Sequence, residues 1–201
     1  CLVGSEMCIR DRIKADKFPE PTGLCISTFL LGCLLCIPAA SLNNYFIPDL
    51  SYAYLAGFTE ETLKFAAIYF YIRKKTDFDE PMDAIVYGTL ISLGFATLEN
   101  FQYVYSAGNP DFIATLRAFT AIPLHACCGI IMGYYFGLYI FKDRNRLNLF
   151  KSLFLAIAFH ASYNYFATRN VLLMFFVLIV LIMFAKKLHK LLKAEQLSKQ
   201  S

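Results

Sequence analysis

Tryptophan is absent from the 201-residue chain, and charged residues make up only 17% of it. Hydrophobic residues supply 58% and the mean hydropathy is +0.50, so the chain is too apolar for an ordinary soluble domain. The charged residues lie in short clusters between long uncharged runs, which is typical of membrane helices. The net charge of +4 therefore reflects the segments that flank these helices and not a nucleic-acid-binding surface. Without tryptophan, an interfacial aromatic belt must consist mainly of tyrosines, with candidates at Tyr45, Tyr52, Tyr103 and Tyr105.

A disulfide framework is also missing, although the chain has seven cysteines. Cys33 and Cys36 have CxxC spacing, but they lie within the apolar run LLGCLLCIP, where cysteine behaves as a small hydrophobic residue. The adjacent Cys127 and Cys128 would point to different faces of a helix. We therefore predict neither disulfides nor a cysteine metal site.

The chain begins at Cys1 and not at a methionine. Its first residues, CLVGSEMCIRDR, resemble translated sequencing-adapter sequence, so we interpret 1–12 as non-native and leave it out of the fold prediction. Residues 13–23 are predicted to be a polar cytoplasmic loop, and we expect membrane helices upstream of Ile13 to be missing. No signal peptide can be recognised.

The fold class predicted from the hydrophobic runs is an all-α, polytopic transmembrane bundle. A membrane helix needs about 20 mainly apolar residues, and six stretches within a membrane domain at 24–188 meet this need: 24–46, 51–72, 84–106, 114–141, 149–167 and 170–188. The fourth is long and contains Pro123, so we expect it to tilt, kink or begin outside the bilayer. Residues 189–201 are predicted to form a basic cytoplasmic tail lying against anionic lipid.

Basic residues alternate between loops, which predicts the orientation because cytoplasmic loops are enriched in lysine and arginine. The loops NNYFIPDLS and YSAGNPDF have neither, and the ATRN turn has only Arg169. Both ends of the chain are therefore predicted to be cytoplasmic. The basic residues of the alternate loops are Lys14, Lys17, Arg73, Lys74, Lys75, Lys142, Arg144, Arg146, Lys151, Lys186, Lys187, Lys190 and Lys193.

Ionisable residues inside the predicted spans are the candidate site, because each costs at least about 2.5 kcal/mol to insert. At a rise of about 1.5 Å per residue, the candidates on four spans come to lie roughly 10–15 Å from the outer ends of their helices. This agreement in depth predicts one shared polar site. The candidate residues are Glu60, Glu61, Lys64, Glu99, Asn100, His125, His160 and Asn164.

Helical spacing within the spans supports the same site. Glu60 and Lys64 are four residues apart and share a helix face, with the acid on the amino-terminal side, the better order for attraction. Two adjacent carboxylates, Glu60 and Glu61, are not both ionised in a low-dielectric environment without compensation from Lys64 or a histidine. His160 and Asn164 are also four residues apart. Small residues form ridges that favour close helix packing, namely Gly129, Gly133 and Gly137 after His125, and Gly88, Ser92 and Ala96 before Asn100.

Each candidate also has a purely structural interpretation. The two glutamates could form an ion pair with Lys64, and Glu99 with Asn100 could hydrogen-bond neighbouring helices. Either histidine could be a packing residue, as could Asn164. Arg117 could extend to the membrane surface.

The sequence resembles the PrsW family of intramembrane proteases from about Lys17 to His189, and this family is distantly similar to the CAAX prenyl endopeptidases and the bacterial immunity-type membrane proteases. FPEPTG before the first span is similar to the family's polar loop. CAAX-type relatives have histidine where this chain has Glu99, so the details of their mechanism are not carried over to this chain. The motifs that carry the resemblance are Glu60-Glu61-x-x-Lys64, GFATLEN with Phe95, Glu99 and Asn100, Arg117 with His125, and His160-x-x-x-Asn164.

The resemblance implies an endopeptidase of the bacterial cytoplasmic membrane that cleaves membrane-anchored proteins such as an anti-sigma factor. Glu60 or Glu61 would activate water, Lys64 would tune the carboxylates, and His125, His160 and Asn164 would position the water or stabilise the oxyanion. Zinc held by Glu60, His125 and His160 is the alternative, but no HExxH helix occurs, and metal-free glutamate catalysis is preferred. Two other functions use the same polar cavity: a proton-coupled transporter, although no internal repeat is visible, and a non-catalytic membrane chaperone.

Overall fold

The computed structural model describes residues 20–198, and its regular structure there is entirely helical. Residues 1–19 and 199–201 lie outside the described part, and with them the predicted adapter segment, most of the predicted first loop and the end of the basic tail. The elements in chain order are α2 (Thr22–Phe46), the 3₁₀ segment η1 (Leu50–Leu55), α3 (Ala56–Phe70), η2 (Ile72–Lys74), α4 (Pro81–Tyr105), α5 (Pro110–Phe119), α6 (Ala121–Leu138), the π-helical η3 (Tyr139–Asp143), α7 (Arg146–Ala167) and α8 (Val171–Ser198).

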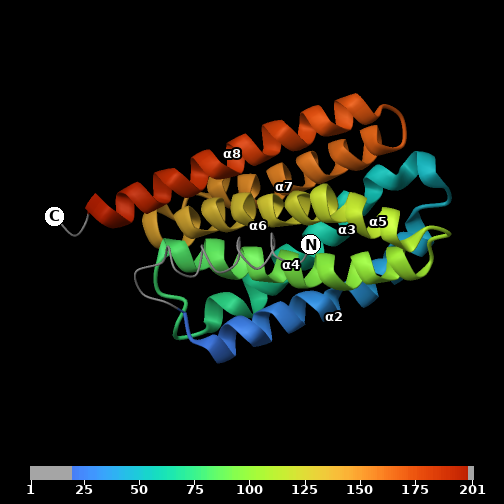
Figure 1. The fold of residues 1–201 in the computed structure, drawn as a ribbon. Helices are drawn as coiled ribbons and strands as arrows, with labels where there is room; N and C mark the ends of the chain where they lie inside the picture. Colours follow the sequence, from blue (N-terminus) through green and yellow to red (C-terminus); the bar gives the residue numbers. More distant parts are fainter. Residues whose placement is uncertain (1–19, 199–201) are drawn as a thin grey trace.

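The long helices run side by side, with α4 and α6 in the middle of the bundle (Figure 1). Helix α2 packs on one side of this pair, and α7 and α8 pack on the other (Figure 1). Helix α4 is buried without interruption from Met82 to Ala96, whereas α2 and α8 expose rows of large apolar side chains such as Leu30, Leu34, Leu172 and Phe176. Exposed rows of this kind suit contact with lipid chains.

The all-α membrane bundle is confirmed, but six spans are more than the structure shows. Among the described residues, four helical stretches are long and apolar enough to cross a bilayer: α2, α4, the stretch Pro110–Asp143, which comprises α5, α6 and η3, and α8. Helix α3 has 15 residues, which is about 22 Å at helical rise and shorter than a hydrocarbon core of about 30 Å. Helix α7 is long enough, but its 22 residues include Arg146, Lys151, His160 and Asn164, which lower its hydropathy.

The predicted fourth span contains a break at Thr120, where α5 ends and α6 begins. Thr120 has φ −121° and ψ −63°, outside the helical region. Pro123 is the third residue of α6, and in the first turn of a helix the missing N–H of proline leaves no helical hydrogen bond unmade. The predicted fourth span is therefore divided into a separate short helix, α5, and the longer helix α6. At the other end of the chain, α8 continues past the predicted boundary at residue 188 to Ser198, with Leu192 buried.

Glycines set the closest helix contacts, as the small-residue ridges predicted. A Cβ added at Gly129 would lie 2.6 Å from the carbonyl oxygen of Gly88, and one at Gly133 would lie 2.1 Å from that of Ala84. The two ridges therefore face each other across the α4–α6 interface. A reciprocal pair holds α2 against α4, because Gly32 lies against the backbone of Ile91 and Gly94 against that of Phe29.

We expect Gly133→Ala to lower the free energy of unfolding by about 1–3 kcal/mol, because its Cβ would push α6 away from the α4 backbone. Gly23→Ala in α2 is the matched control, since nothing lies within 4 Å of a Cβ placed there and alanine favours a helix by up to about 1 kcal/mol. Thermal unfolding in detergent micelles measures both changes. Equal stability of the two variants would contradict the close α4–α6 contact.

Candidate active site

Helix α3 presents Glu60, Glu61 and Lys64 to the inside of the bundle, where they are 2%, 0% and 0% exposed. The helix can approach α7 closely because Gly57, one turn earlier, lies against the backbone of Ala161. Three ionisable side chains on a short buried segment must compensate one another or find partners on other helices. Their partners come from α2, α4, α6 and α7.

Lys64 lies among three helices and contacts groups on each. Its Nζ donates to Glu61 Oε1 at 2.7 Å, lies 2.8 Å from His125 Nδ1, and is 4.0 Å from Glu60 Oε2. It also lies 4.2 Å from the centre of the Phe95 ring, a cation–π contact. An ammonium group has three N–H donors and no acceptor, so the His125 nitrogen that faces it must be the acceptor.

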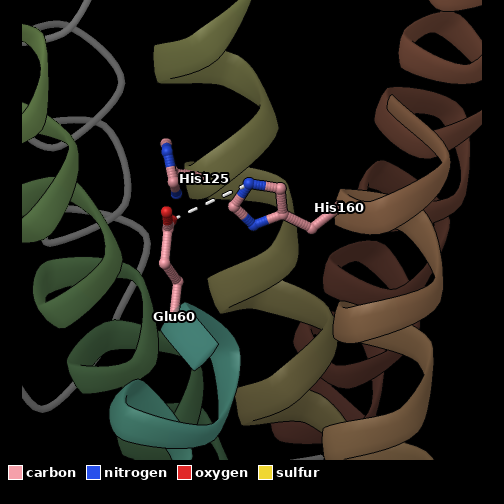
Figure 2. Close-up of side chains that lie close together, drawn as sticks. All are labelled: Glu60, His125 and His160. Carbon is pink, nitrogen blue, oxygen red and sulfur yellow. Dashed lines mark ion pairs between the residues drawn. The ribbon is translucent and has the colours of Figure 1, made fainter. Parts of the chain in front are cut away.

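The two histidines are each fixed by a glutamate on one ring nitrogen. His125 therefore carries its proton on Nε2 and donates to Glu99 Oε2, 2.9 Å away. His160 Nδ1 lies 2.8 Å from Glu61 Oε1 and donates to it, which leaves Nε2 facing Glu60 Oε2 at 3.8 Å. The two rings are perpendicular, with centres 4.9 Å apart. Figure 2 shows both rings pointing toward the end of the Glu60 side chain.

Glu99 is held in turn by Arg117 from α5. Arg117 Nη2 donates to Glu99 Oε2 at 2.7 Å and its Nε donates to Asn100 Oδ1 at 2.5 Å, while its guanidinium stacks on Tyr103 at 3.9 Å. Only 17% of the Arg117 side chain is exposed, so the interpretation of Arg117 as a residue that simply extends to the membrane surface is wrong. Asn100 joins the network through Arg117.

Asn164 lies apart from these contacts. Its Nδ2 donates to the carbonyl oxygen of Ala53 at 3.3 Å and so ties α7 to η1. The structure thus brings together seven of the eight predicted site residues in one connected network and gives Asn164 a contact with the neighbouring segment.

Two residues that the sequence did not single out complete the surroundings of Glu60. Asn43, in the last turn of α2, donates from Nδ2 to Glu60 Oε1 at 3.1 Å, and its Oδ1 accepts from the hydroxyl of Thr59. In the sequence, Asn43 belongs to the polar stretch NNYFIPDLS, which was interpreted as a loop. The one available signal was that this stretch overlaps the end of the first predicted span.

Among the three carboxylates, Glu60 has the weakest compensation. Glu61 Oε1 receives contacts from Lys64 and His160 at 2.7 and 2.8 Å, and Glu99 Oε2 receives contacts from Arg117 and His125 at 2.7 and 2.9 Å. Oε2 of Glu60 and Oε2 of Glu61 both have no hydrogen-bond partner within the described part of the chain. The difference lies in their other oxygens, because Glu61 Oε1 contacts a lysine and a histidine whereas Glu60 Oε1 accepts only from the neutral amide of Asn43. A buried oxygen without a partner at a cluster of charged groups is a candidate for binding and catalysis.

Glu60, His125 and His160 also form a candidate metal site. One donor atom from each residue lies within 4.8 Å of the others. The arrangement fits zinc, because an oxygen and two imidazole nitrogens are suitable ligands and each imidazole donates its other N–H to a carboxylate, as metal-binding histidines do. A metal bound through His125 Nδ1 would have to replace the contact of that nitrogen with Lys64.

Comparison with known proteins finds one family, both with a family model and with individual proteins. A family model described as "PrsW family intramembrane metalloprotease" matches residues 20–186. Protease PrsW of Halalkalibacterium halodurans is 34% identical over 160 residues, which cover 76% of this chain and 74% of that protein. Protease PrsW of Bacillus subtilis is 35% identical over 162 residues (74% and 72%), and that of Clostridioides difficile is 30% identical over 161 residues (73% and 68%). No solved structure matches the chain.

Proposed function

The chain belongs to the PrsW family of intramembrane metalloproteases and is a membrane-embedded peptidase, and from this premise we propose that Glu60 activates the water that hydrolyses the peptide bond. The observation that supports this role is Oε2 of Glu60, which has no hydrogen-bond partner in the described part of the chain and faces His160 Nε2 at 3.8 Å in a buried cluster. Glu61 and Glu99 instead hold the histidines in fixed orientations.

The geometry around Oε2 suits a water molecule. Glu60 Oε2 and His160 Nε2 are 3.8 Å apart, which is too far for a direct hydrogen bond but allows one water to lie about 2.8 Å from both. Such a water donates one proton to each atom, so an oxygen lone pair remains for attack on the carbonyl carbon. Glu60 takes the proton as the C–O bond forms and returns it to the amide nitrogen as the C–N bond breaks.

Lys64 is suited to stabilise the negative charge that develops on the carbonyl oxygen. Two of its three N–H groups are used by Glu61 and His125, so the third can be offered to an oxyanion near Glu60 Oε2, 4.0 Å away. A donor that is already fixed and shielded from water stabilises a transition state without reorganisation. His125 supports this arrangement by accepting from Lys64 and donating to Glu99.

Zinc bound by Glu60, His125 and His160 would lower the pKa of its bound water toward 7 and polarise the carbonyl. Glu61 and Glu99 would then keep the same role, because each accepts the remaining N–H of one imidazole. Metal content measured on purified protein shows whether this group takes part.

The protein is embedded in a membrane, and we propose the bacterial cytoplasmic membrane with both ends of the described chain on the cytoplasmic side. The starts of α2, α4 and α7 lie at the same end of the bundle as the end of α8 (Figure 1). The loops that precede α4 and α7 and the end of α8 carry the basic residues, as cytoplasmic segments do. We propose membrane-anchored proteins of the anti-sigma-factor type as substrates.

Cleavage by protein reconstituted in lipid vesicles tests the proposal. We expect the wild-type protein to cut a fluorogenic peptide that spans the membrane, and His160→Asn to lower kcat by about 100-fold, because the water loses one of its two acceptors. His189→Asn is the matched control, since His189 lies on α8 outside the cluster. Flux of ions or solutes without peptide cleavage would contradict a protease.

A further inference from the structure

The end of α2 contacts the proposed base directly, although α2 contains no aspartate, glutamate, lysine, arginine or histidine. Asn43 Nδ2 donates to Glu60 Oε1 at 3.1 Å. The carboxylate can only accept, so the nitrogen of the Asn43 amide must face Glu60 and its oxygen must face Thr59. The Thr59 hydroxyl shares its one proton between this oxygen, which is the nearer acceptor, and the carbonyl oxygen of Ala56 at 3.1 Å. The orientation of the amide is thus determined on both sides.

The contact depends on the register of α2, and glycines fix that register. Gly32 on α2 lies against Ile91, and Gly94 on α4 lies against Phe29, so each helix has a backbone contact where a Cβ would approach within about 2 Å. Asn43 is 11 residues after Gly32, about 17 Å along the helix. A slip of one residue would rotate Asn43 by about 100° away from Glu60.

We propose that Asn43, oriented by Thr59, is a positioning residue that holds Oε1 of Glu60 and leaves Oε2 as the reacting oxygen. The inference rests on the proposed role of Glu60 and adds α2 to the active site. A neutral amide suits this task because it satisfies one carboxylate oxygen without supplying a charge that would neutralise the base. Charged donors, by contrast, serve Glu61 and Glu99, which are not proposed to take up protons.

Kinetics on reconstituted protein test the inference, with the fluorogenic membrane-spanning peptide as probe. We expect Asn43→Ala and Thr59→Val each to lower kcat by about 10-fold or more with little change in KM, as substitutions of residues that orient an active group do. Thr59→Ser keeps the hydroxyl and should restore most of the lost rate. Thr168→Val is the control, because its hydroxyl donates to Tyr165 at the far end of α7.

A second measurement does not depend on activity. In protein labelled with ¹⁵N-asparagine, the side-chain resonance of Asn43 should shift in Glu60→Gln and in Thr59→Val but not in Thr168→Val. An unchanged Asn43 resonance would overturn the inference, and so would wild-type kcat in Asn43→Ala and Thr59→Val when Glu60→Gln is inactive. The proposed function fails by a different result, namely a wild-type protein that does not cleave or a Glu60→Gln variant with full activity.

Discussion

Glu60→Gln is expected to reduce kcat by about 1,000-fold, the loss typical of a removed general base. Glutamine has the same shape, and its Oε1 can still accept from Asn43 Nδ2, 3.1 Å from the glutamate oxygen, so the bundle should fold normally. What disappears is the proton acceptor at Oε2, which an amide group cannot replace. Cleavage of the membrane-spanning peptide, followed by mass spectrometry of the products, measures the change.

The companion variant Glu61→Gln distinguishes the roles of the two adjacent glutamates. Glu61 accepts from Lys64 and His160, so its replacement disturbs the position of both partners and should lower stability as well as rate. Glu60→Gln should lower the rate alone. Full activity in Glu60→Gln together with an inactive, stable Glu61→Gln would reverse the assignment.

Zinc content of the same preparations shows whether Glu60 also acts as a ligand, since the loss of a ligand should lower metal content in Glu60→Gln.

The sequence predicted the helical membrane bundle and the grouping of the polar residues for one physical reason. Ionisable side chains are costly in hydrocarbon, so Glu60, Glu99, His125 and His160 had to meet, and their depths along separate helices could be estimated from residue counts. Residue counts do not give the rotation of each helix about its own axis, which decides the neighbour that a side chain faces. The pairing of His125 with Glu99 and of His160 with Glu61 therefore required the structure.

Other features were missed because their signals are weak in a single sequence. Asn43 is uncharged and lies 17 residues before Glu60 in the sequence, so nothing in its chemistry marks it as a neighbour of Glu60, and the role of Thr59 depends on its contact with Asn43. The irregularity expected from Pro123 is present, but the sequence did not give its position, which is Thr120, three residues earlier, in the turn that proline disturbs. The number of spans was too high because the start of the second predicted span forms η1, which leaves α3 with 15 residues, and because charged and polar residues lower the hydropathy of α7.

Lys64→Met is expected to lower the free energy of unfolding by about 3–5 kcal/mol, the usual cost of removing one partner of a buried ion pair. Methionine fills a similar volume, so the loss reflects charge and not a cavity. Without the ammonium, the fully buried Glu61 keeps a single close donor, His160, and Glu60 loses its nearest cation. Thermal unfolding in detergent micelles, with the protein's own tyrosine fluorescence as signal, measures the change.

Lys142→Met is the matched control, because Lys142 pairs with Glu195 at the surface, where the two side chains are 38% and 31% exposed, and such pairs contribute about 1 kcal/mol or less. The double variant Lys64→Met/Glu61→Gln should recover part of the stability, since it removes the uncompensated carboxylate together with its partner. If Lys64→Met and Lys142→Met were equally stable, Lys64 would not be the buried counter-ion of the site. The cluster would then need another cation, and a metal held by Glu60, His125 and His160 is the candidate that the donor atoms supply.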